Sequence, residues 1–267
     1  MNEKLKLMCV LAHPDDESLG TGGILARYAA EGIETYLVTA TRGERGWSGK
    51  PEDYPGLQEL GRIREAELRC AAENLGVREV SFLDYVDGDL DQADPARVIG
   101  QIAAQLRRVR PHVVVTFGPD GIYGHPDHIA ISQFTTAATV AAADASYGAG
   151  DLPHRVSKLY YIAETFDMLD IYQASFGDIV MPVDGVARRA QGWQDWAITT
   201  RVTAQPHWPV VWRAVRCHSS QVSGYGKVGS LSPDQHERLW GYQTYYRAYS
   251  LINGGRKVEQ DLFEGLR

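Results

Sequence analysis

Short apolar runs separated by longer amphipathic stretches make up the first half of this sequence. Apolar runs that predict buried strands lie at residues 5–12, 33–41, 78–83 and 111–117. Helices, several opened by proline or closed by glycine, are predicted at residues 24–30, 57–75, 95–109 and 126–143. Strands that alternate with helices imply a mainly parallel sheet with helices on both faces. The predicted fold class is therefore α/β, a doubly wound, Rossmann-like sandwich.

Beyond residue 145 the pattern is less regular. Strands are predicted at residues 158–163 and 178–183, and helices at residues 186–200, 208–217 and 234–250. No stretch has the composition of a linker between domains. We therefore expect one domain over residues 1–267, with an α/β core in residues 1–145 and an irregular C-terminal elaboration in residues 146–267.

Histidines and acidic residues follow the first and the fourth predicted strands. Residues 13–17 (HPDDE) come directly after the first strand, and residues 123–128 (YGHPDH) come shortly after the fourth. In an open parallel sheet, ligand sites form beyond the carboxyl ends of the strands. Both clusters should therefore lie on the same rim of the sheet.

Together the two clusters predict a metal site. His13 and Asp16 are three residues apart across a strand-to-helix turn, which can bring both side chains to one point. Pro126 in the first turn of a helix places His125 near the N-cap and His128 on the same helical face. Two histidines and a carboxylate, with positions open for water, are typical of hydrolytic zinc sites. The same ligands also serve non-haem iron(II) oxygenases, so the expected metal is Zn²⁺, with Fe²⁺ as the alternative.

Two further carboxylates flank this predicted site. Asp15 can stay uncoordinated beside Asp16, as a general base near a metal-bound water requires. Asp127 can orient His125 by accepting a hydrogen bond from its ring. A Ser-His pair in residues 217–221 (CHSSQ) has no nucleophile elbow, which disfavours nucleophilic catalysis there.

Composition narrows the class of partner and the compartment. The net charge of −7 argues against nucleic acid, because phosphate binding needs clustered excess lysine and arginine. The three cysteines are far apart, odd in number and without a CxxC pair, so disulfides are not expected. A reducing compartment is therefore expected. The N-terminal apolar run is shorter than a signal core, and no run is long enough for a membrane span. A cytoplasmic protein is expected, and a homo-oligomer is compatible with the sequence.

The clustered residues resemble the PIG-L/LmbE-like family of zinc-dependent de-N-acetylases. The matching segments are residues 12–16 (AHPDD), 41–44 (TRGE), 64–67 (REAE), 125–128 (HPDH) and 218–221 (HSSQ). Among its branches, the sequence looks most like the deacetylases and amidases of mycothiol metabolism, which share GxYGHPDH. The resemblance implies that the metal ligands are His13, Asp16 and His128. It implies that the general base is Asp15. It also implies that His125 and Tyr123 stabilise the oxyanion. Contacts to sugar hydroxyls are implied for Arg64 and Asp87.

The sequence therefore predicts a zinc-dependent amide hydrolase that deacetylates an N-acetylglucosamine-type sugar or glycoconjugate, a small-molecule N-acyl substrate. A thiol-conjugate amidase of the same family is an alternative. An iron(II) oxygenase is a rival of a different class, although such enzymes commonly carry HxD on an all-β roll, whereas this chain has HxxD on a βα turn. A non-catalytic sugar- or nucleotide-binding protein is a further rival, and it would not need the free carboxylate of Asp15.

Overall fold

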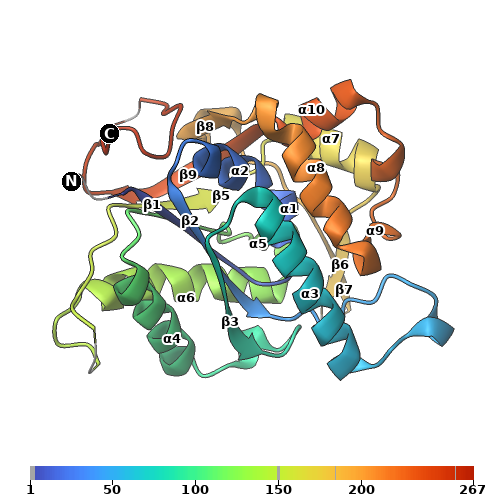
Figure 1. Cartoon of the computed structure of the whole chain (residues 1–267), viewed down its shortest axis with the longest axis horizontal. Coiled ribbons are helices and arrows are strands. Elements are labelled where there is room, and N and C mark those ends of the chain that lie inside the picture. Colours follow the sequence, from blue (N-terminus) through green and yellow to red (C-terminus); the bar gives the residue numbers. More distant parts are fainter. Residues whose placement is uncertain (1–3, 149–150, 184, 256) are drawn as a thin grey trace.

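A seven-stranded, mainly parallel sheet forms the centre of the molecule (Figure 1). The computed structural model describes residues 4–148, 151–183, 185–255 and 257–267. The sheet has the order β3-β2-β1-β4-β5-β9-β8. Strands β1 to β5 run parallel, and at one edge β9 pairs antiparallel with β5 and β8 pairs antiparallel with β9. The strand bounds are β1 (Lys6–Leu11), β2 (Glu34–Thr41), β3 (Glu79–Tyr85), β4 (Val113–Thr116), β5 (Lys158–Ile162), β8 (Thr200–Thr203) and β9 (Tyr242–Ser250).

Helices cover both faces of this sheet (Figure 1). Helices α4 and α6 pack together on one face, and α2, α3 and α8 pack together on the other. This is the predicted doubly wound α/β fold. The helix bounds are α1 (Asp16–Gly20), α2 (Gly22–Ala30), α3 (Leu57–Leu75), α4 (Pro95–Val109), α5 (Gly121–Gly124), α6 (Pro126–Ala143), α7 (Phe166–Phe176), α8 (Trp208–Cys217), α9 (Ser219–Val222) and α10 (Pro233–Trp240).

The strongest sequence signals matched their elements closely. Helices α3, α4, α6 and α8 have the predicted bounds. Strand β4 is fully buried between β1 and β5, as its apolar sequence indicates. The turn after β1 differs, because α1 begins already at Asp16 and α2 at Gly22, before the predicted start at residue 24. The acidic HPDDE segment is thus partly helical.

Two predictions in the C-terminal half were wrong. Residues 186–200, predicted as a helix, instead contain β7 (Val186–Arg189), which pairs with β6 (Val180–Val183) in a small second sheet. Residues 234–250, also predicted as one helix, form α10 only up to Trp240 and then strand β9. The sequence of β9, YQTYYRAYS, is rich in tyrosine and threonine, which favour strands. The C-terminal half therefore adds β5, β9 and β8 to the main sheet. That the chain forms a single domain stays a prediction.

The expectation that no disulfide forms was also wrong. Cys70 on α3 and Cys217 at the end of α8 are disulfide-bonded, although 147 residues separate them in sequence. The packing of α3 against α8 brings their Cα atoms to 5.8 Å, within the range that a disulfide spans. Cys9 is a buried free thiol. The cysteines therefore no longer support a reducing compartment. Among the described residues, no helix is long and apolar enough to cross a membrane.

Candidate active site

The two histidine clusters meet at the carboxyl ends of β1 and β4. These strands are parallel neighbours in the centre of the sheet, and the order of strands along the chain reverses between them. Ligand sites of open α/β sheets form at such a switch point. The prediction that both clusters share one rim of the sheet is therefore confirmed.

Donor atoms of three side chains converge at this point. The Nδ1 atom of His13 lies 3.2 Å from Nε2 of His128, and the carboxylate oxygens of Asp16 lie 3.7 Å and 3.5 Å from these two nitrogens. All three side chains are buried. Donor atoms about 2.1 Å from a tetrahedral metal lie roughly 3.4 Å apart. The donor types and their spacing therefore fit a divalent metal ion.

The opposite nitrogen of His13 is held by two carboxylates. Its Nε2 atom lies 3.1 Å from Oδ1 of Asp87 and 3.1 Å from Oδ2 of Asp127. The oxygens of Asp127 also accept the backbone N–H groups of Gly88 and Leu90, at 2.7 Å and 3.1 Å. His13, Asp87 and Asp127 are close enough to bind a metal themselves. However, a carboxylate on the outer nitrogen is the usual support of a metal-bound histidine.

Two expected contacts are replaced by this arrangement. Asp127 was predicted to orient His125, but its carboxylate pairs with His13. Asp87 was expected to face the sugar, yet it is buried beside His13. Burial raises the pKa of Asp87, but the hydrogen bond and charge of His13 outweigh burial and hold that pKa below its ordinary value. Asp87 is therefore an anion that can fix His13.

The neighbouring imidazoles are kept neutral. Burial, together with the charge of His13, lowers the pKa of His128 well below its ordinary value. The same two causes lower the pKa of His125 to about 4. In the described part of the chain, the buried Nδ1 atom of His128 has no hydrogen-bond partner. Neutral imidazole is the form that binds metals.

His125 is the N-cap of α6. Its Nδ1 atom accepts the backbone N–H of Asp127 at 3.1 Å, so the proton of the neutral ring lies on Nε2. The ring of His125 stacks on that of His128 with 4.7 Å between the centroids, and Tyr123 meets the His128 ring edge-on at 5.4 Å. His125 and Tyr123 therefore both flank the converging donors, which the spacing of the motif predicted for His125 and the resemblance implied for Tyr123.

Asp15 lies beside the converging donors in a strained conformation. Its φ of 105° is in the left-handed region, which residues other than glycine seldom adopt. Its Oδ2 atom accepts hydrogen bonds from Tyr225 at 2.9 Å and from Arg64 at 3.2 Å. Arg64 is only 3% exposed and also donates to the carbonyl oxygens of Pro14 and Gly43. Arg64 therefore holds the loop of Asp15, and its contact with a sugar stays a prediction.

The C-terminal HSSQ segment anchors three parts of the site. The Nε2 atom of His218 donates to Glu17 at 2.7 Å. Ser219 and Ser220 donate to Glu67 on α3. Gln221 donates to the carbonyl oxygen of Gly46, in the loop after β2.

Sequence reasoning assigned no role to Glu17, Glu67 or Tyr225. Each of these three residues makes a contact that spans about 150 to 210 residues of sequence, so no local pattern could reveal it. The resemblance marks the HSSQ segment as a family motif but assigns it no role.

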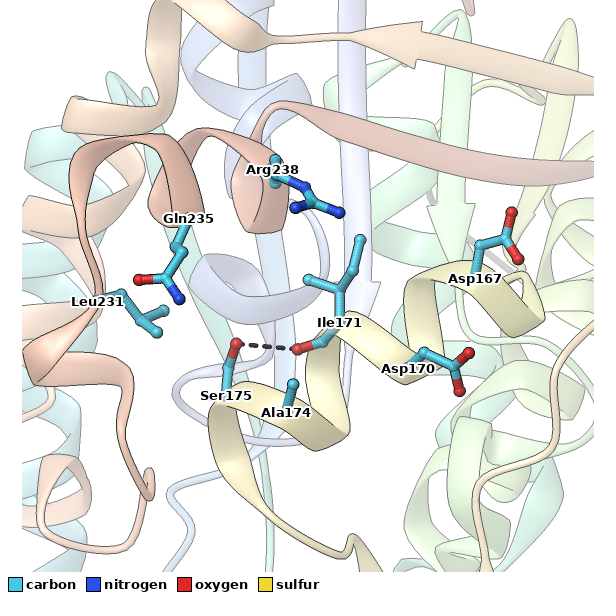
Figure 2. Close-up of a pocket in the computed structure, with 8 residues that line it drawn as sticks. All are labelled: Asp167, Asp170, Ile171, Ala174, Ser175, Leu231, Gln235 and Arg238. Carbon is cyan, nitrogen blue, oxygen red and sulfur yellow. Dashed lines mark hydrogen bonds between the residues drawn. The ribbon is translucent and has the colours of Figure 1, made fainter.

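A cavity of about 540 Å³ opens directly onto Asp15, Asp16 and His128. Arg64 and Asp87 do not line this cavity. A second hollow of about 630 Å³ lies between α7 and α10 (Figure 2) and contains none of the predicted site residues. The smaller cavity is therefore the candidate substrate site. Its lining residues are Asp15, Asp16, Leu19, Gly20, Ser48, Phe117, Ile122, Tyr123, His128, Glu164, Leu169, Tyr172, Phe176, Asp178, Ile179, Val180, Gly224 and Tyr225.

Comparisons with known proteins give matches along almost the whole chain. The sequence model of the family described as "PIG-L: GlcNAc-PI de-N-acetylase" matches residues 8–139. A protein of Thermobifida fusca named 1D-myo-inositol 2-acetamido-2-deoxy-alpha-D-glucopyranoside deacetylase is 37% identical, over 98% of this chain and 100% of its own. A protein of Thermobispora bispora with the same name is 32% identical, over 98% of each chain. The conserved protein TT1542 of Thermus thermophilus has a similar structure, with a TM-score of 0.66 and 27% identity over 94% of this chain and 97% of its own.

These relatives bear on the predicted chemistry as well as on the fold. Relatives more than 30% identical match 98% of the chain, and the family model spans both histidine clusters. The prediction of a deacetylase, a hydrolase that acts on amides, is confirmed. The chain belongs to the PIG-L family of GlcNAc-PI de-N-acetylases.

Proposed function

We propose that this protein removes the acetyl group from the amide nitrogen of an N-acetylglucosamine-type glycoside. The observation that carries the proposal is the convergence of His13, Asp16 and His128, with Asp15, Asp16 and His128 lining one cavity. The relatives' names support the substrate class, because they describe deacetylases of an inositol glycoside of N-acetylglucosamine.

His13, Asp16 and His128 would hold the metal, for which we propose Zn²⁺. A bound Zn²⁺ would polarise the acyl carbonyl and make a bound water more acidic. Asp87 and Asp127 would fix the ring of His13 and keep its Nδ1 atom aimed at the site. Iron(II) suits the same donors, so metal analysis has to decide between the two metals.

Asp15 would act as the general base and then as the general acid. Both hydrogen bonds from Arg64 and Tyr225 end on its Oδ2 atom, which leaves Oδ1 for the proton of the attacking water. The proton would then pass from Asp15 to the nitrogen of the leaving amine. Arg64, Tyr225 and Glu17 serve this role because they hold the strained loop in one position.

His125 and Tyr123 would stabilise the oxyanion of the tetrahedral intermediate. The Nε2–H group of His125 is the donor because Nδ1 is engaged by the helix. The hydroxyl group of Tyr123 is the second donor, from the wall of the cavity. Donors of this kind act on charge that develops only in the transition state.

Amine release by the metal-loaded protein tests the proposal. We would measure it on N-acetylglucosamine, its inositol glycoside, N,N′-diacetylchitobiose and acylated thiol conjugates. Deacetylation of the sugars is expected, with loss of activity after chelation and recovery with Zn²⁺. Asp234→Asn is the control variant, because Asp234 is an exposed aspartate on α10 that does not line the cavity. Full activity in metal-free protein would contradict the mechanism, and cleavage of thiol conjugates alone would favour the amidase alternative.

A further inference from the structure

The cavity at the candidate metal site continues along one face of α7. Leu169, Tyr172 and Phe176 line it at helical spacing, and Ile179 and Val180 of the following segment close its side. This wall lies outside the segment that the family model matches. Pockets of roughly 300–1,000 Å³ bury a whole small ligand, so about 540 Å³ exceeds the needs of an acetamido group.

One carboxyl group interrupts this apolar wall. Glu164 comes two residues after β5 and directly before Thr165, the N-cap of α7. It is 9% exposed and lines the cavity. Its backbone carbonyl accepts the N–H of Trp193, but its side chain makes no hydrogen bond or ion pair with any described residue. A buried carboxyl without a partner costs free energy, so its presence calls for an explanation.

We propose that Glu164 binds hydroxyl groups of the second ring of a glycoside substrate, a sugar or a cyclitol, in a subsite beyond the metal. This rests on the proposed function, because the cavity is taken to receive the leaving part of an N-acetylglucosaminide. The aromatic and aliphatic side chains of α7 would cover the apolar face of that ring. The carboxyl group of Glu164 would meet its hydroxyl edge.

Hydroxyl groups match the electrostatics of this position better than other ligands do. Burial, with a smaller contribution from Asp120, raises the pKa of Glu164 to about 7. Near neutral pH the carboxyl therefore both donates and accepts hydrogen bonds, as a hydroxyl group does. A long acyl chain would leave the carboxyl without a partner. A cationic amine would require full ionisation, which burial opposes.

Comparison of a one-ring and a two-ring substrate tests the subsite. We would measure kcat/KM for N-acetylglucosamine and for its inositol glycoside with wild type, Glu164→Gln and Glu164→Leu. Glu164→Leu should lower kcat/KM for the glycoside by roughly tenfold or more, and for the single sugar by less than about threefold. Glu164→Gln should retain part of the preference. Asp170→Asn is the matched control, because Asp170 is an exposed carboxylate on α7 that does not line this cavity.

Three results would overturn the subsite. These are an equal loss on both substrates, no loss on either, and a changed preference for acyl length or for cationic glycosides alone. A binding measurement keeps the subsite separate from the proposed function. Metal-loaded Asp15→Asn protein would be titrated with the inositol glycoside, with and without the additional Glu164→Leu substitution. The Kd should be higher when Glu164 is replaced. If the wild type deacetylates no N-acyl sugar, the proposed function is contradicted. If Glu164→Leu leaves the affinity for the glycoside unchanged, the proposed subsite is contradicted.

Discussion

The backbone N–H of Asp15 donates a 3.0 Å hydrogen bond to Oε2 of Glu17, and this contact holds Asp15 at a φ of 105°. The other oxygen of Glu17 accepts from Ser18 and from His218, which lies 201 residues further along the chain. Strained residues persist where the surrounding contacts over-determine them. The C-terminal segment thus helps to set the conformation of the proposed base.

Glu17→Leu should therefore impair turnover without loss of the metal. The variant removes the acceptor of the Asp15 N–H group, and a misplacement of about 1 Å can cost roughly 100-fold in rate. We expect kcat to fall by roughly 10–100-fold, with bound metal unchanged and part of the activity restored in Glu17→Gln. Measurement of kcat, KM and metal content checks this. A loss of thermal stability with normal kcat would show that Glu17 serves folding alone.

Substitutions of Asp15 and Asp16 should impair the enzyme in different ways. Asp15→Asn is expected to keep the metal and to lose roughly 10²–10⁴ in kcat, the usual size of a general-base effect. Asp16→Ala should lose tight metal binding, because its carboxylate faces both ligand histidines. Metal analysis with steady-state kinetics on both variants separates the roles. The opposite pattern, metal loss in Asp15→Asn and none in Asp16→Ala, would reverse the assignment.

His125→Ala tests whether the N-cap of α6 also serves catalysis. If Nε2–H stabilises the oxyanion, kcat should fall by roughly 10²–10³ while KM and bound metal change little. If His125 only caps the helix, the variant should lose about 1 kcal/mol of stability and keep its turnover. Kinetics, metal content and melting temperature on this variant distinguish these outcomes, and normal kcat would exclude the catalytic role.

The sequence predicted most of the parallel core and the meeting of the two histidine clusters, for a physical reason. Residues 13–17 and 123–128 each follow an apolar strand, and the geometry of parallel sheets brings such ends together. What the sequence could not predict depends on contacts between distant segments. Asp127 is two residues from His125 but pairs with His13, because the loop around Gly88 fixes its oxygens.

The secondary structure of the C-terminal half was predicted incorrectly in places for a related reason. Strand β9 is held by β5 and β8 on either side, so its partners, more than its own pattern, determine its structure. Likewise, Cys70 and Cys217 meet only because α3 packs against α8.

Reduction of the Cys70–Cys217 disulfide should lower stability. Closing a loop of this length restricts the unfolded chain, and removal of such a bond typically costs about 2–5 kcal/mol. The Cys70→Ser/Cys217→Ser double variant should unfold at lower urea concentration than wild type. A reductant should shift the wild type to the same midpoint and leave the double variant unchanged. An unaltered wild-type midpoint in reductant would show that the bond contributes nothing to stability.

The pH dependence of stability provides a test of Glu164 that needs no substrate. Burial raises the pKa of its carboxyl from 4.5 to about 7 in the folded protein. Between these pH values the folded state binds more protons than the unfolded state, so this group makes stability fall as pH rises. The effect is absent below pH 4.5 and complete above pH 7, where it amounts to roughly 3 kcal/mol.

Glu164→Gln removes this titration and should therefore change the pH profile in one direction. Relative to wild type, the variant should be equally stable near pH 4.5 and should become progressively more stable up to about pH 7.5. Because the groups that do not interact with Glu164 titrate identically in both proteins, the difference between their unfolding free energies reports Glu164, with a smaller contribution through Asp120. Asp170→Asn, which changes an exposed carboxylate on the following helix α7, should give a flat difference. A difference that does not grow with pH would mean that Glu164 is ionised and paired in solution, and the unpartnered carboxyl of the subsite would be excluded.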